Sequence, residues 1–137
     1  MTTVVVDLAS WNLCGEVHPD PCQLSHEIQV PPGTQKILLK LMDPGDGGYS
    51  WQSLERPSQS AVRDPTILRL QNDTSMCGQG MVGCFGINQF LIVYNKPLEH
   101  GQSYVPSPVF LEIPPGHDDI FKSVHDATVL QLDISVT

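Results

Sequence analysis

Apolar and polar residues alternate along several short stretches of this chain, most regularly in its last eleven residues, Ala127 to Thr137. Every second residue there is apolar, namely Leu130, Leu132, Ile134 and Val136. A β-strand points successive side chains to opposite faces of a sheet, so a period of two predicts a half-buried strand. No stretch of the chain shows a comparable helical periodicity.

The same texture predicts about eight strands, separated by turns rich in proline and glycine. The expected strands are Thr2–Ala9, Glu27–Val30, Lys36–Met42, Tyr49–Ser53, Thr66–Gln71, Ile87–Asn95, Ser103–Ile113 and Ala127–Thr137. We expect Lys36–Met42 to be central because both of its faces are largely apolar. Since proline cannot donate a backbone hydrogen bond, Pro106 and Pro108 predict that Ser103–Ile113 is an edge strand or bends there.

Turn signals recur about every eight to twelve residues in places, which is typical of β-sandwiches and jelly rolls. The chain of 137 residues has the size of one domain, and 40% of it is hydrophobic, enough for one core. The sequence therefore predicts a single all-β domain over residues 1–137. Its expected architecture is an antiparallel β-sandwich with long irregular loops, and a jelly roll is one form of it.

Charge and hydropathy exclude several classes of partner. The formal net charge is −8, from 15 acidic and seven basic residues, which opposes binding to nucleic-acid phosphates and to anionic membranes. No apolar stretch reaches the roughly 18 residues of a transmembrane helix. The start, Met1 to Asp7, has no basic region and too short an apolar run for a signal peptide. We therefore expect synthesis in the cytoplasm.

One group of metal-ligand residues recurs at intervals of four, namely Cys14, His18, Cys22 and His26. Zinc accepts four nitrogen or sulfur ligands from an irregular backbone, so this set is a zinc candidate. Pro19 and Pro21 exclude a continuous helix through it. The competing interpretation is structural: the cysteines are buried thiols, or they form local disulfides, Cys14 with Cys22 and Cys77 with Cys84. Four cysteines allow three pairings, and the sequence does not choose among them. Without a signal peptide, reduced cysteines are expected.

A second candidate is the glycine-rich stretch from Cys77 to Gly86. Backbone amides around Cys84 could form an oxyanion hole beside a nucleophilic thiol, with a histidine as base. The available histidines are His100, His117 and His125. Nothing in the sequence links them to Cys84, and glycines in such a stretch are equally typical of tight turns.

A third candidate combines acidic loop residues with aromatic rings. Asp43 and Asp46 could hold calcium through carboxylate oxygens, and Tyr49 and Trp51 could offer a stacking surface for a sugar ring. The alternative is a set of solvated turn residues, since aspartate and glycine are common in ordinary turns.

The segment from Ile28 to Pro44, with Val-Pro-Pro-Gly-Thr, a strand and then Asp43-Pro44, resembles a turn-and-strand element of phosphatidylethanolamine-binding-like proteins. Secreted pre-peptidase sandwich domains share it equally well. No His-Trp pair follows Pro44, and His117 is followed by Asp118 rather than arginine. The resemblance therefore implies a strand and turn of a β-sandwich and carries over no function.

These observations predict a non-enzymatic protein that needs no cofactor and acts through protein–protein contacts. The leading hypothesis is a component of a larger assembly, such as a viral capsid, decoration or tail protein, whose partners are other copies of itself or other assembly proteins in a virion. One alternative is a lectin-like, calcium-dependent module that binds carbohydrate through Asp43, Asp46, Tyr49 and Trp51. A second is a zinc- or cysteine-dependent hydrolase.

Overall fold

The computed structural model of the chain describes residues 2–8, 23–42, 50–53, 65–75, 77, 86–101, 108–113 and 128–137. Its eight strands are β1 (Thr2–Asp7), β2 (Gln23–Val30), β3 (Thr34–Met42), β4 (Ser50–Ser53), β5 (Thr66–Arg69), β6 (Ile87–Val93), β7 (Val109–Ile113) and β8 (Thr128–Val136). Among the described residues, no helix has the length and apolar character needed to cross a membrane. The all-β prediction is confirmed.

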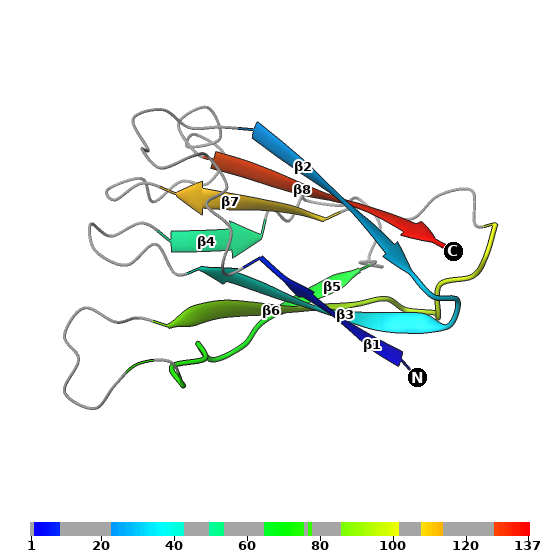
Figure 1. The fold of residues 1–137 in the computed structure, drawn as a ribbon, viewed down its shortest axis with the longest axis horizontal. Helices are drawn as coiled ribbons and strands as arrows, with labels where there is room; N and C mark the ends of the chain where they lie inside the picture. Colours follow the sequence, from blue (N-terminus) through cyan, green and yellow to red (C-terminus); the bar gives the residue numbers. More distant parts are fainter. Residues whose placement is uncertain are drawn as a thin grey trace.

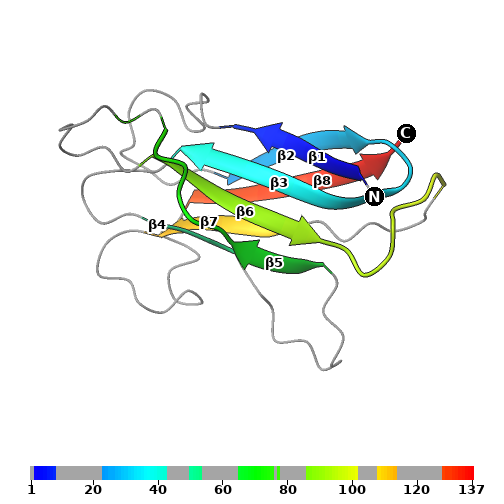
Figure 2. The same cartoon turned by 90° about the horizontal axis from the view of Figure 1, so that it is seen from below.

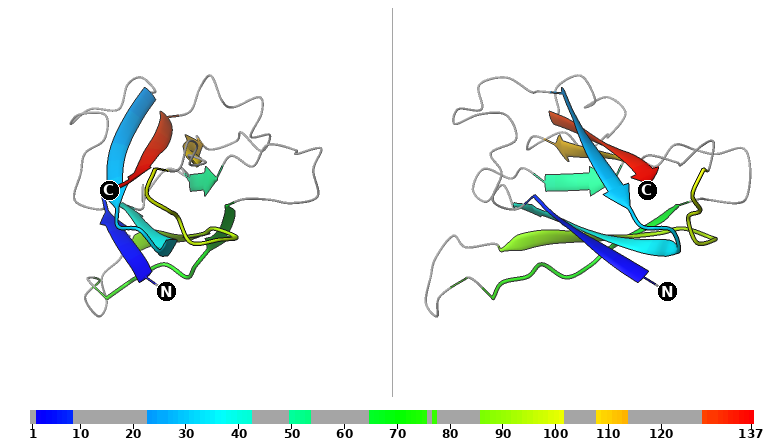
Figure 3. Two further views of the ribbon diagram at one scale, coloured as in Figure 1. Left: turned by 90° about the vertical axis from the view of Figure 1, so that its right-hand side faces the viewer. Right: turned by 45° about the vertical axis from the view of Figure 1, so that its right-hand side comes forward.

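The strands form two four-stranded sheets that pack face to face as a sandwich (Figure 1). Sheet A has the order β1-β3-β6-β5, which Figure 2 shows from below, and sheet B has the order β2-β8-β7-β4. Figure 3 shows the two layers from the side. Four strand pairs are antiparallel, but β1 with β3 and β2 with β8 are parallel. The expected antiparallel β-sandwich is therefore confirmed, with two parallel strand pairs among its six.

The alternation of buried and less buried positions along the strands determines which side chains form the core. In β3 the buried apolar residues are Ile37, Leu39 and Leu41, and in β6 every second residue from Asn88 is buried. The two sheets meet through aromatic rings as well: the centroids of Phe90 in β6 and Phe110 in β7 lie 5.0 Å apart with the rings tilted by 54°. A tilted pair at this spacing is a favourable aromatic geometry. The interior is thus packed by side chains of both sheets.

The structure tests two predictions about whether a strand is central or at the edge of its sheet. β3 lies between β1 and β6, so its central position is confirmed. β7 lies between β8 and β4, so the first of the two alternatives expected for Ser103–Ile113, an edge strand, is wrong. The second alternative, a bend at Pro106 and Pro108, falls largely on residues 102–107, outside the described residues. The strand begins only at Val109, after Pro108, which removes the conflict between proline and an inner position.

One end of the sandwich, which we call the Gly33 end, contains the short turn Pro31–Gly33 between β2 and β3. Gly33 has φ +89°, a left-handed conformation that favours glycine. Backbone hydrogen bonds tie this turn to the segment after β6: the Gly33 amide donates to the Leu98 carbonyl, and the Leu98 amide donates to the Thr34 carbonyl, both at 2.8 Å. Tyr94 likewise donates to the Gln35 carbonyl at 2.9 Å. The side chains of Thr34 and Gln35 add hydrogen bonds to the carbonyls of Pro31 and Tyr94 at the same end.

Candidate protein-binding end

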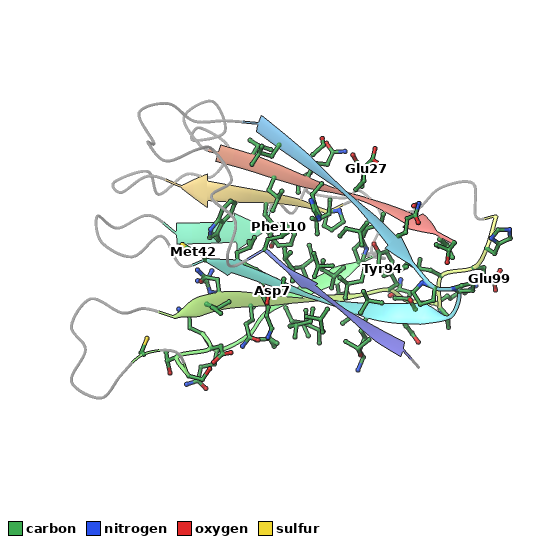
Figure 4. The ribbon with its side chains drawn as sticks, in the orientation of Figure 1. Asp7, Glu27, Met42, Tyr94, Glu99 and Phe110 are labelled. Carbon is green, nitrogen blue, oxygen red and sulfur yellow. The ribbon has the colours of Figure 1, made fainter. Side chains whose placement is uncertain are left out.

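The opposite end of the sandwich, which we call the Met42 end, is where four connections between strands leave and return. In sheet A, β1 and β3 end there and β6 begins there, since Met42 pairs with Ile87 and Asp7 pairs with Lys40. In sheet B, β7 ends there, and β2, β4 and β8 begin there. Figure 4 shows Met42 at this end and Glu99 at the other. The connections are residues 8–22, 43–49, 70–86 and 114–127.

Trp51 joins the two strand ends that flank the connection 43–49. We call the strand ends that flank a connection its roots. Its side chain is only 2% exposed, and its indole Nε1 donates to the Met42 carbonyl at 3.2 Å. The bond joins the last residue of β3 to the second residue of β4, and so joins the two sheets. The buried indole packs in the core and offers no exposed stacking face to a sugar. Its role here is to hold the two strand ends together.

Arg69 ties the same root to the connection 70–86. Its guanidinium donates from Nη1 to the Trp51 carbonyl at 2.6 Å and from Nη2 to Asn88 Oδ1 at 2.8 Å. Arg69 Cζ also lies 5.4 Å from the ring centroid of Phe90, within the range of a cation–π contact. One side chain thus contacts the beginning of β4 and the beginning of β6.

The connection 70–86 is itself pinned at its roots. Asp73 and Ile87 exchange backbone hydrogen bonds of 2.9 and 2.8 Å, and the Cys77 amide donates to the Thr74 carbonyl at 2.9 Å. Gly86 has φ +84°, and a Cβ there would fall on the Asp73 carbonyl oxygen. Only glycine therefore fits the close approach of these two backbone segments.

An Asx turn at Asp73 stabilises the ionised form of its carboxylate. The Ser75 amide donates to Asp73 Oδ1 at 3.0 Å. This hydrogen bond is the main reason why the pKa of Asp73 lies below its usual value, with smaller contributions from the Ser75 side chain and from Lys40. The carboxylate is exposed, so its role is to order the turn rather than to act as a buried acid.

Cys77 is disulfide-bonded. The expectation of reduced cysteines is therefore wrong for this residue, because the fold brings a second cysteine within bonding distance and a linear sequence cannot show that. The other three cysteines, Cys14, Cys22 and Cys84, lie outside the described residues. The bond adds a covalent constraint to a segment that is already pinned by Asp73 and Gly86.

Most of the candidates for metal, sugar and catalytic chemistry lie outside the described residues. These are Cys14, His18, Cys22, Asp43, Asp46, Tyr49, Cys84, His117 and His125. Of the zinc set, His26 is described: it is half-buried on the core face of β2, in register with Leu132. Within the described ranges, no three metal-ligating side chains gather at one point.

Of the three histidines proposed as a base for Cys84, His100 is described. It is exposed and follows β6 and Leu98 at the Gly33 end of the sandwich. Cys84 itself lies outside the described residues, so the thiol hypothesis stays a prediction.

The sequence-based interpretation missed the three residues that organise this end, Arg69, Gly86 and Asn88. One signal was available for Arg69: it shares the inward parity of its strand with Ile67, which packs against the core. A charged residue at an inward position needs partners there. Gly86 had no such signal, since its requirement comes from Asp73, thirteen residues earlier.

Comparisons with known proteins give one informative match. A search with family models finds none that fits this chain, and a sequence search of curated proteins finds no match. Among solved structures, the chain is similar to one in the structure of PbICP-C in complex with falcipain-2, with a TM-score of 0.52 and 15% identity. The alignment covers 98% of this chain and 99% of that one. At this identity the likeness shows a shared fold over essentially the whole length.

Proposed function

We propose that this chain binds and inhibits a cysteine protease through its Met42 end. The observation that carries the proposal is the full-length fold match to a structure of PbICP-C bound to falcipain-2, which is a cysteine protease. In this proposal the partner is another protein rather than further copies of the chain. The hypothesis of a viral capsid, decoration or tail protein has no support from the comparison.

The layout of the Met42 end supports a binding role. Four connections start and finish there, and the strand ends that carry two of them, 43–49 and 70–86, are held by Trp51, Arg69 and the Asp73–Ile87 pair. A surface held in one conformation before binding loses less entropy on association than a mobile one. Segments carried on a rigid β-scaffold are a common way to build a binding surface.

The composition of the four connections also suits a protein interface. Interfaces are enriched in aromatic residues and methionine, and their energy is concentrated in a few of these. The connections contain Trp11, Tyr49, Met81, Phe85 and Phe121. Inhibition would then result from occlusion of the protease cleft, with no chemical step performed by this chain.

The direct test is titration of active-site-counted falcipain-2 with the purified chain. We expect stoichiometric inhibition with a dissociation constant below about 1 µM, equivalent to about −8 kcal/mol. Trypsin, a serine protease, is the specificity control and should be unaffected. Absence of both inhibition and binding at micromolar concentrations would disprove the proposal.

Two variants test which end of the sandwich contacts the protease. Tyr49→Ala, in a connection at the Met42 end, should weaken inhibition at least tenfold, because truncating an aromatic interface anchor often removes more than about 1.4 kcal/mol. His100→Ala, at the Gly33 end, is the matched control and should leave inhibition unchanged. Equal loss in both variants would contradict the assignment to this end.

A further inference from the structure

Arg69 is an exposed residue of an edge strand, yet its side chain reaches into the joint between the two sheets. Its two charge-assisted hydrogen bonds go to the Trp51 carbonyl in sheet B and to Asn88 in sheet A. Asn88 is 1% exposed, so its amide is a fixed and not a surface partner. The guanidinium is further held over the Phe90 ring.

These contacts form one continuous chain of hydrogen bonds across the Met42 end. The Trp51 indole donates to the Met42 carbonyl, where the connection 43–49 begins. The Trp51 carbonyl, where that connection has just ended, accepts from Arg69. Arg69 then donates to Asn88, two residues after Gly86, where the connection 70–86 ends. Backbone pairing of Met42 with Ile87 already fixes where the connection 43–49 begins relative to where the connection 70–86 ends. Arg69 adds a side-chain link between the other end of the connection 43–49, at Trp51, and the start of β6.

The chemistry suits arginine specifically. A guanidinium is planar and presents donors in a rigid fork, so it can bond two acceptors at a fixed separation while its face lies on an aromatic ring. A lysine ammonium at the same position is a point charge on a flexible stem. It could reach one of the two acceptors, but it would not fix the distance between them.

We propose that Arg69 is a positioning residue of the protein-binding end: it fixes the beginning of β4, where the connection 43–49 ends, against the beginning of β6, where the connection 70–86 ends, and so favours binding of the partner. The inference rests on the proposed function of this end. It predicts that Arg69 affects affinity for the partner beyond its effect on folding, although it is not itself required to touch the partner.

The test compares Arg69→Ala and Arg69→Lys with Thr66→Ala, an exposed position on the same strand at the Gly33 end. Binding to falcipain-2 is measured kinetically, and the folded fraction is counted by stoichiometric titration. We expect Arg69→Ala to bind about tenfold to a hundredfold more weakly per folded molecule, the range expected for loss of charge-assisted hydrogen bonds. Arg69→Lys should recover thermal stability more than affinity, and Thr66→Ala should match the wild type.

A purely structural role would lower the folded fraction and leave the affinity of the folded molecules unchanged, and that result would overturn the inference. If Arg69→Ala does not fold, Arg69→Lys carries the same test, since it keeps the charge and most of the stem.

A second measurement does not depend on the partner. Hydrogen exchange of the backbone amides in residues 50–53 and 86–89 of the free chain should accelerate in Arg69→Ala at both roots and in Thr66→Ala at neither. If the wild type does not bind falcipain-2, the proposed function fails, and this exchange pattern still decides the positioning role. Unchanged exchange at both roots would disprove it.

Discussion

The two ends of the sandwich differ in what their side-chain hydrogen bonds connect. At the Gly33 end, the side chains of Thr34 and Gln35 bond to carbonyls of the adjoining turn and of the segment after β6, alongside the backbone bonds there. At the Met42 end, the Trp51 indole and the Arg69 guanidinium bond from one sheet to the other. Substitutions at the first end should therefore affect stability, whereas substitutions at the second should also affect the geometry of the binding surface.

The largest effect on stability is expected for Leu98→Ala at the Gly33 end. Leu98 is 2% exposed, and truncation of a buried leucine leaves a cavity that typically lowers the free energy of unfolding by about 2–5 kcal/mol. Urea denaturation measures this loss. Inhibition per folded molecule should stay at the wild-type value. A fall in affinity as large as the fall in stability would show that the two ends are not independent.

Gly86→Ala tests the Met42 end. The alanine must adopt a left-handed φ, at about 1–2 kcal/mol, and its Cβ would displace the Asp73 carbonyl and weaken two backbone hydrogen bonds worth about 1 kcal/mol each. We expect a loss of about 3 kcal/mol in denaturation and a weaker inhibitor. A variant with wild-type affinity would indicate that the root of the connection 70–86 does not matter for binding.

Gly33→Ala is the matched substitution at the other end. The φ is nearly the same, but no atom lies within 4 Å of the added Cβ. Only the backbone strain remains, about 1–2 kcal/mol, and affinity should not change. The comparison of both alanine variants by denaturation separates conformational strain from steric conflict. Equal losses would mean that the approach of Asp73 to Gly86 is easily relieved.

The smallest effect concerns pH. The pKa of Asp73 is lowered in the folded chain by the Ser75 amide, so its ionised form stabilises the fold above the usual carboxyl pKa of 3.8. That contribution is lost as the pH falls through the lower folded pKa. Thermal melts of the wild type and Asp73→Asn should differ at pH 7 and converge once the pH has fallen below the lowered pKa of Asp73 in the folded chain. A difference that stays constant with pH would assign the effect to hydrogen bonding without charge.

The fold could be predicted from the sequence because alternation is a local property. The strand expected at Ala127–Thr137 is observed as Thr128–Val136, and the one expected at Thr66–Gln71 as Thr66–Arg69. Strand order is a non-local property, which is why the inner position of β7 and the two parallel pairs could not be predicted. The alternation within a segment indicates which of its residues are buried, but it does not indicate which strands lie beside it in the sheet.

The organisation of the Met42 end was harder to predict for the same reason. Arg69 meets Trp51 and Asn88 only through the sheet register, and Gly86 meets Asp73 only through a backbone bridge. The zinc, calcium and thiol hypotheses were built from residues close together in sequence. The contacts that tie this end together join residues 13 to 19 positions apart or lie on different sheets.

The order of the strands along the chain also determines when each sheet can be completed during synthesis. All four strands of sheet A have been synthesised once Val93 is added, but sheet B still lacks β7 and β8, and β8 lies between β2 and β7. At the usual ~5–20 residues per second, residues 94–137 take roughly two to nine seconds to add. During that interval the core residues Ile37, Leu39 and Phe90 have only an incomplete second sheet to pack against. These seconds are when a nascent chain of this kind is most open to misassociation or to capture by a chaperone.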